Sequence, residues 1–166
     1  MGLLGFGRPN VERLTAKGDI EGLVRAAKYK KDPALAEAAR AALEDQLEFF
    51  VTKLASKNLR RVVLSREALK LIAEPSVTLL SDVLVKGDVG KRCDAAFALG
   101  EVGLPSALPA LGAALKDKDP HVRVLAVKSL ARLDDERVPE LLDKASRDRD
   151  ESVRYHAGKA RKRLGS

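Results

Sequence analysis

Apolar side chains recur along this chain at three- and four-residue spacing, the pattern of a helix that buries one face. One such stripe begins two residues after Pro120 and consists of Val122, Ala126, Ser129 and Leu133. Asp119 precedes it, where a short acidic side chain caps a helix start, and proline suits the first helical position. Alternating runs of Val, Ile and Thr, which predict strands, do not occur. The pattern predicts an all-α fold.

The same arrangement returns every 31 residues. Each period has an N-capping aspartate and, four residues later, an arginine: Asp88 and Arg92, Asp119 and Arg123, Asp150 and Arg154. Further along each period come a small residue and then a larger apolar one: Ala95 and Val102, Ala126 and Leu133, Ala157 and Leu164. One period earlier the match is weaker, with Arg61, Leu64 and Leu71. Gly100, Gly103, Pro105 and Pro109 separate the first of these stripes from a second one, and Pro139 starts the corresponding second stripe of the next period. Each period therefore predicts two helices that bury their apolar faces by stacking on neighbouring periods.

The first third of the chain departs from this period. Asn10 is expected to cap a short helix ending at Ala16, and Asp19 another ending near Lys28. Residues 35–54, which follow a turn at residues 30–33, keep helical spacing without Gly or Pro, which fits either one long helix or two helices with a break at residues 44–46. We therefore expect one domain over residues 1–166, with a flexible segment at 1–9, irregular helices at 10–56 and repeats at 57–166.

Composition and charge exclude several classes of protein. Hydrophobic residues make up 45% and charged residues 33%, as in soluble globular domains. The net charge of +7 is spread along the chain, because the part up to Val83 has 14 basic and 11 acidic residues and the rest has 17 and 13. Charge alone therefore gives little support for nucleic-acid or membrane binding. No apolar run is long enough to span a membrane, and Met1–Gly7 lacks the basic region of a signal peptide, so we expect a cytoplasmic protein.

Few residues are suited to catalysis or metal binding. One cysteine excludes a disulfide framework, and Cys93 aligns with Val62, Val124 and Tyr155, which predicts a small, partly buried apolar residue. His121 and His156 have no carboxylate cluster beside them, and residues 87–91 lack the spacing of a phosphate loop. No nucleophile stands beside a base. We expect no catalytic residues, no metal and no cofactor.

The segment Asp119–Leu133, preceded by Ala107–Leu115, resembles HEAT repeats, in particular the short HEAT-like repeats first named from phycobilisome lyase subunits. The resemblance runs from about residue 33 to the C-terminus and is strongest after Asp88, while residues 10–31 resemble the lead-in helices of small prokaryotic members. It implies an α-solenoid, a HEAT/armadillo-like superhelix of about five stacked helix pairs, with the Asp-capped helices on its inner side. It also implies that the periodic arginines pair with acidic or carbonyl groups of the adjacent repeat. Neither histidine is followed by the glutamate that marks the di-iron hydroxylases among these proteins.

The face opposite the buried stripe carries the candidate binding residues. On the inner helices it has an apolar centre and basic edges, together with Glu101, and it suits an acidic amphipathic protein segment. The predicted partner-binding residues are Val63, Arg66, Lys70, Phe97, Leu125, Lys128, Arg132, His156, Lys159 and Arg163. A solvated charged face that binds nothing is the alternative interpretation.

The leading functional hypothesis is a non-catalytic scaffold or adaptor that binds a protein or peptide on this face. A nucleic-acid-binding HEAT-like protein is one alternative, although the DNA glycosylases of this type are longer and use Trp, which this chain lacks. An accessory subunit of an enzyme such as a chromophore lyase is another, although Cys93 is poorly placed for thioether transfer. Oligomeric state and partner identity stay open.

Overall fold

The computed structural model describes residues 9–54, 56 and 58–165. All regular secondary structure in these ranges is helical, which confirms the all-α prediction. The chain forms two compact units, residues 1–72 and 73–166. Apart from Pro9, the segment predicted to be flexible lies outside the described residues. The prediction of a single domain stays a prediction.

The first unit consists of α1 (Val11–Ala16), α2 (Ile20–Ala27), α3 (Pro33–Glu44), α4 (Leu47–Leu54) and α5 (Leu59–Ile72). Its N-caps are those expected: Asn10 Oδ1 accepts from the Arg13 N–H at 2.7 Å, and Asp19 Oδ1 accepts from the Gly22 N–H at 2.8 Å. Helix α2 packs on α3, and α4 packs on α5. The core of the unit contains Leu23, Leu43, Phe50 and Leu69.

Two helices, not one, occupy residues 33–54, with Asp45 and Gln46 between them. The end of α3 tightens, because the Gln46 N–H bonds to the carbonyl of Leu43, three residues back. Leu43 and Leu47 are both buried on either side of this break. The break at residues 44–46, one of the two alternatives open from the sequence, is therefore confirmed.

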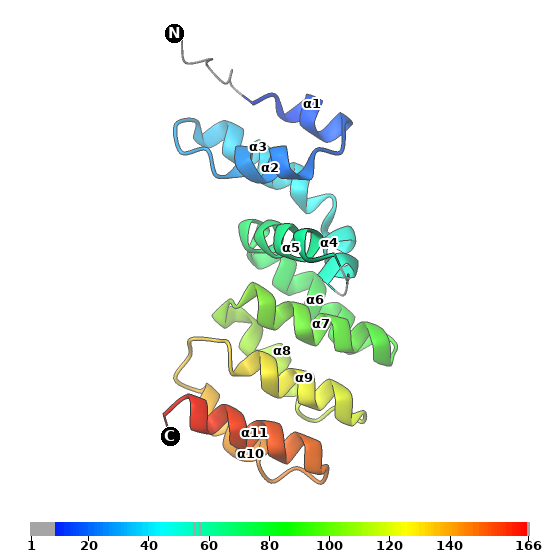
Figure 1. Cartoon of the computed structure of the whole chain (residues 1–166), viewed down its shortest axis with the longest axis vertical. Coiled ribbons are helices and arrows are strands. Elements are labelled where there is room, and N and C mark those ends of the chain that lie inside the picture. Colours follow the sequence, from blue (N-terminus) through cyan, green and yellow to red (C-terminus); the bar gives the residue numbers. More distant parts are fainter. Residues whose placement is uncertain (1–8, 55, 57, 166) are drawn as a thin grey trace. The chain divides into compact units, whose positions relative to one another are not determined.

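The second unit consists of two layers of helices. Its elements are α6 (Glu74–Lys86), α7 (Val89–Val102), the 3₁₀ turn η1 (Pro105–Ala107), α8 (Leu108–Ala114), α9 (Pro120–Leu130), α10 (Val138–Ala145) and α11 (Glu151–Arg163). Helices α7, α9 and α11 lie side by side in one layer, and each packs on α6, α8 or α10 of the other (Figure 1). This is the stack of helix pairs that the 31-residue period predicts.

The periodic residues take the predicted places in this unit. Asp88, Asp119 and Asp150 cap α7, α9 and α11, and each carboxylate accepts a backbone N–H of the first turn. The small residues of each period, Ala95, Ala126 and Ala157, have no exposed surface. Alanine at these positions lets the helices of the two layers approach closely, since a larger side chain would not fit a close-packed interior.

Two arginine–aspartate pairs join successive repeats. Arg92 of α7 donates from Nε and Nη2 to Asp117 at 2.8 and 2.9 Å, and Arg123 of α9 donates in the same way to Asp148 at 2.9 Å each. Asp117 lies in the loop before α9 and Asp148 in the loop before α11, so we call these the inter-repeat Arg–Asp pairs. Both guanidiniums are buried, and bidentate geometry makes such pairs strong.

The structural role expected for the periodic arginines is thus confirmed for two of them. Arg154 instead donates to the carbonyls of Asp148 and Arg149, in the loop before its own helix, at 2.8 and 3.0 Å. Arg61 is exposed, so the buried arrangement does not recur at that position.

Candidate functional site

A groove of about 460 Å³ lies between α11 and the C-terminal end of α9. Lys128 lies in the last turn of α9, Ala131 caps this helix and Arg132 follows it. The lining positions on α11 span two helical turns, so their side chains share one face. The groove is lined by Lys128, Ala131, Arg132, His156, Lys159, Ala160 and Arg163. Five of these are partner-binding residues predicted from the sequence.

One cation of the groove is held by its neighbours on α7. The Arg132 guanidinium forms an ion pair with Glu101 and lies over the ring of Phe97, 5.6 Å from the ring centroid. Glu101 is only 8% exposed, so the expectation that it lies on the open face was wrong. It is buried because the guanidinium of the next helix covers and pairs with it.

The predicted apolar centre of the face is also partly covered. Phe97 and Leu125 are half-buried, and neither lines the groove. Arg132 lies over the Phe97 ring and shields part of it from water. These two side chains are therefore only partly exposed, and their role in binding a partner stays a prediction.

Arg163 ties α11 to the end of α9, because its Nη2 donates to the carbonyl of Ala131, which caps α9. This carbonyl is one of those left without an intrahelical partner at a helix C-terminus. The contact orients the guanidinium, but the acceptor is neutral, so the positive charge of Arg163 is not cancelled.

The two lysines of the groove differ from the arginines. Lys128 and Lys159 are exposed, and neither ammonium has an ion pair or hydrogen bond among the described residues. No carboxylate in the described part of the chain lines this groove. The positive charge here is thus available to a ligand.

His156 lies between these lysines and is partly buried. Burial lowers the pKa of its imidazole, and the positive charges of Lys128 and Lys159 lower it further. The ring packs edge to face on Tyr155, with centroids 5.3 Å apart. At neutral pH the imidazole is therefore uncharged and offers one N–H donor.

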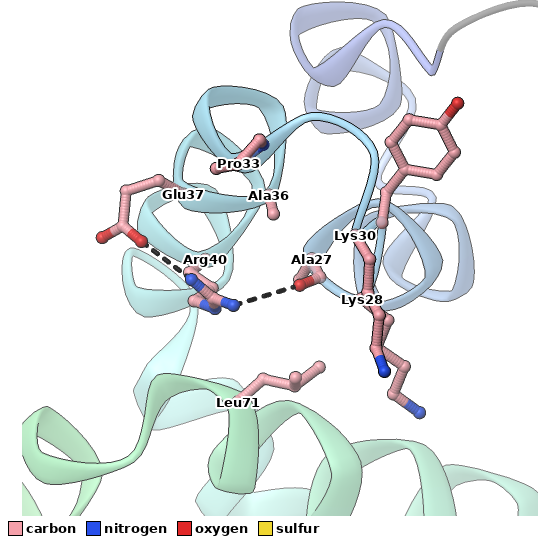
Figure 2. Close-up of a pocket in the computed structure, with 9 residues that line it drawn as sticks. Ala27, Lys28, Lys30, Pro33, Ala36, Glu37, Arg40 and Leu71 are labelled. Carbon is pink, nitrogen blue, oxygen red and sulfur yellow. Dashed lines mark hydrogen bonds and ion pairs between the residues drawn. The ribbon is translucent and has the colours of Figure 1, made fainter.

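A second hollow, of about 450 Å³, lies within the first unit between α2, α3 and α5 (Figure 2). Two of its three cations have partners: Lys28 pairs with Glu67 at 2.7 Å, and Arg40 pairs with Glu37 at 2.8 Å, whereas Lys30 has no partner among the described residues. Figure 2 shows Arg40 also reaching the Ala27 carbonyl, at 3.5 Å. An anion entering this hollow would meet a single unpaired cation and the Glu37 carboxylate. The described lining of the α9–α11 groove has more unpaired cations and no carboxylate, which makes that groove the better candidate site.

The remaining predicted residues lie on α5, in the first unit. Val63 and Lys70 are exposed, and Arg66 is half-buried. Their membership of one binding face with residues of the second unit stays a prediction.

Other reactive groups do not form a site. Burial raises the pKa of the Cys93 thiol, which keeps it protonated at neutral pH and disfavours nucleophilic chemistry. His121 is exposed beside Asp119, 3.3 Å away. Within the described ranges, no group of three or more His, Cys, Asp or Glu side chains is placed to hold a metal ion. None of the described helices combines the length and apolar character that crossing a membrane requires.

The family model for HEAT repeats matches residues 77–161, which is just over half of the 166 residues. The chain belongs to the HEAT-repeat family. The match covers the helix pairs that carry the α9–α11 groove and both inter-repeat Arg–Asp pairs, so the resemblance found in the sequence is confirmed. The chain matches no curated protein sequence.

Solved structures with the same fold include two HEAT-like proteins. Human deoxyhypusine hydroxylase is 22% identical with a TM-score of 0.53, and the match covers 90% of this chain and 64% of that one. This HEAT-repeat chain therefore spans less than two thirds of the hydroxylase. A chain in the structure of the complex of CpcE and CpcF of phycocyanin lyase from Nostoc sp. PCC7120 is 21% identical to this one, with a TM-score of 0.51. The match covers 87% of this chain and 98% of that one. At these identities the likeness shows the fold, a HEAT/armadillo-like helical solenoid.

The HEAT period also contains signals that sequence reasoning missed. Glu101 and Arg132 are 31 residues apart and hold opposite charges at the same position of neighbouring repeats. Side chains at one register position face each other across α7 and α9, so this spacing could have predicted their ion pair. Asp117 and Asp148 are likewise 31 apart, two residues before the capping aspartates.

Proposed function

We propose that this HEAT-repeat protein is a non-catalytic interaction module and that its α9–α11 groove binds an acidic protein segment. The observation that carries the proposal is the lining of the groove. It brings together four cationic side chains and an imidazole, with no carboxylate among the described residues that line it.

Charge complementarity favours an acidic occupant. The ammoniums of Lys128 and Lys159 have no protein partner in the described structure, so carboxylates of a ligand can pair with them without displacing other groups. The groove is also lined by Ala131 and Ala160, whose apolar side chains suit the methylene groups of Asp and Glu side chains. Charges attract more strongly in a partly enclosed groove than in bulk water, and such complementarity sets partner choice.

The comparisons support a protein partner in general terms. HEAT repeats are stacked helix pairs that present extended surfaces, which suits them to binding. One of the similar structures, CpcE with CpcF, is itself a complex of two proteins. An adaptor role for this chain agrees with both points, although fold alone does not assign a function.

The test uses a displayed library of random peptides, selected on the wild-type protein and counter-selected on the variant K128E/K159E. Peptides retained only by the wild type should be enriched in Asp and Glu, and K128E/K159E should bind them at least about tenfold more weakly. Because both lysines are exposed, the melting temperature should change little.

The matched control is K116E/K162E, which makes the same change in net charge at exposed lysines outside the groove. It should bind the selected peptides as the wild type does. Selected peptides without acidic residues, or equal binding by K128E/K159E and wild type, would contradict the proposal. If instead a short duplex DNA binds with steep salt dependence and K128E/K159E loses that binding, the nucleic-acid alternative holds.

A further inference from the structure

We propose that the α9–α11 groove recognises a phosphorylated protein segment, with the phosphate group placed between Lys128 and Lys159 and beside His156. This inference rests on the proposed function and names the chemistry of the acidic group that the groove prefers. It follows from the charges and the hydrogen-bond donors that line the groove.

The first argument is the balance of charge in the groove. Arg132 is neutralised by Glu101, whereas Arg163 contacts only a neutral carbonyl, and Lys128 and Lys159 have no acidic partner among the described residues. Three positive charges are therefore uncompensated. A single carboxylate brings one negative charge, while a phosphate monoester brings close to two at neutral pH. One phosphorylated side chain therefore neutralises more of the positive charge of the groove than one Asp or Glu side chain does.

The second argument is the number of donors. Each lysine ammonium has three N–H groups, and the His156 imidazole adds one more. They come from two helices, so they can approach a ligand from both walls of the groove. A phosphate group presents three terminal oxygens in three directions, whereas a carboxylate presents two in one plane. Hydrogen-bond donors on both walls of the groove therefore match a phosphate group better than a carboxylate.

The third argument is the environment of His156. The charged groups that line the groove with this ring are Lys128 on α9, Arg132 just after α9, and Lys159 and Arg163 on α11, and the Tyr155 ring packs beside it. Burial and the positive charges of the two lysines lower the pKa of the imidazole in the free protein. A dianion held between the same lysines favours the imidazolium instead, so binding should raise the pKa of His156.

Two other hollows in the described part of the chain differ from this groove. In the hollow of the first unit, Lys28 and Arg40 are each paired with a glutamate, and the Glu37 carboxylate lines the hollow together with the unpaired Lys30. The hollow between α8 and α10 contains Asp148, which already accepts from Arg123. In both places an incoming phosphate would meet a carboxylate, and like charges repel.

The experiment uses the full-length ¹⁵N-labelled protein and three capped peptides, Gly-Ala-X-Ala-Gly, in which X is phosphoserine, glutamate or serine. Titrations followed by NMR at neutral pH should place the shifted amides on α9 and α11. The phosphoserine peptide should bind about tenfold more tightly than the glutamate peptide, since it adds charge-assisted hydrogen bonds. The His156 ring signals, assigned with the variant His156→Gln, should titrate at higher pH in the presence of the phosphopeptide.

Two variants and one further ligand complete the test. K128A/K159A should bind the phosphoserine and glutamate peptides equally weakly, and K116A/K162A should keep the preference of the wild type. Inorganic phosphate should bind more weakly than the phosphopeptide, because the groove also contacts the peptide. Equal affinity for inorganic phosphate would overturn the assignment to a protein segment.

The outcomes separate this inference from the proposed function. Groove binding of the glutamate peptide as tight as that of the phosphopeptide would overturn the phosphate preference and leave the acidic-segment function in place. Amide shifts that lie outside α9 and α11 for all peptides would overturn both proposals.

Discussion

The backbone of Gly100 in α7 lies directly against Ser129 in α9. A Cβ atom placed on Gly100 would fall 2.5 Å from the Cβ of Ser129 and 2.7 Å from its Cα, closer than real Cβ contacts come. The Ser129 hydroxyl is buried and donates to the carbonyl of Ala96 on α7 at 2.8 Å. The two helices therefore approach until their backbones nearly touch, which only glycine allows at this position.

The variant Gly100→Ala should destabilise the protein by about 1–3 kcal/mol, because the added methyl group forces α7 and α9 apart in a close-packed interior. The free energy of unfolding, measured by urea denaturation, checks this.

Gly158 provides the control, since it lies within α11 and a Cβ there would meet no atom within 4 Å. Gly158→Ala should stabilise the protein by about 0.5–1 kcal/mol through helix propensity alone. If both substitutions change the free energy of unfolding in the same direction, the close approach of α7 and α9 does not explain the effect of Gly100→Ala.

The inter-repeat Arg–Asp pairs should matter more than exposed ion pairs. Asp148→Ala leaves the buried Arg123 guanidinium without its carboxylate and should cost about 3 kcal/mol of unfolding free energy. Asp143→Ala removes an exposed carboxylate that pairs with Arg161 and should cost less than about 1 kcal/mol. Thermal and urea unfolding of the two variants would measure the difference; equal losses would show that burial of the pair is unimportant.

Acid should destabilise the protein through the same aspartates. The hydrogen bonds from Arg92 lower the pKa of Asp117; burial raises that of Asp148, but the hydrogen bonds from Arg123 and the Asp150 N–H outweigh it and lower the pKa overall. The side chain and N–H of Arg137 lower the pKa of Asp135 to about 2.

Carboxyl groups whose pKa is lower in the folded state stabilise it fully above their unfolded pKa, near 4, and lose that contribution as the pH falls through the folded pKa. Unfolding free energy should therefore fall steadily from about pH 4 toward pH 2. In the variant D117N/D148N the decrease should be smaller, because neither amide titrates. An equally steep decrease in this variant would assign the acid sensitivity to other groups.

Ala73, which precedes α6, has φ 57° and ψ −115°, a conformation that side chains other than glycine rarely adopt. Ala73→Gly should relieve this strain and stabilise the protein by about 1 kcal/mol. The variant Gly103→Ala should destabilise the protein by about 1 kcal/mol, because Gly103 caps α7 in the left-handed conformation with φ 70°. Melting temperatures that move in the same direction for both variants would contradict this account.

Periodicity was sufficient to predict most of the fold. The helix starts at Asp88, Asp119 and Asp150 depend on local side-chain caps, so they follow from neighbouring residues alone. The break at Asp45 and Gln46 could not be chosen in advance, because the apolar spacing of one long helix and of two short ones is the same.

The candidate site was harder to predict for a different reason. A single helix shows which face Lys128 and Phe97 occupy, but it does not show what the neighbouring helix places over that face. Arg132 covers Phe97 and neutralises Glu101, which are contacts between repeats. Tertiary packing thus decides which cations of the groove are paired within the protein and which can pair with a ligand.

Each inter-repeat Arg–Asp pair takes its arginine from one repeat and its aspartate from the loop that opens the next. A segment of one period, such as residues 117–147, carries an aspartate for the repeat before it and an arginine for the repeat after it. Duplicating that segment in frame would give a complete pair at each end of the inserted copy. Tandem duplication of the corresponding gene segment would thus lengthen the protein by whole repeats. Each added repeat would be joined to its neighbours by the same Arg–Asp pairs.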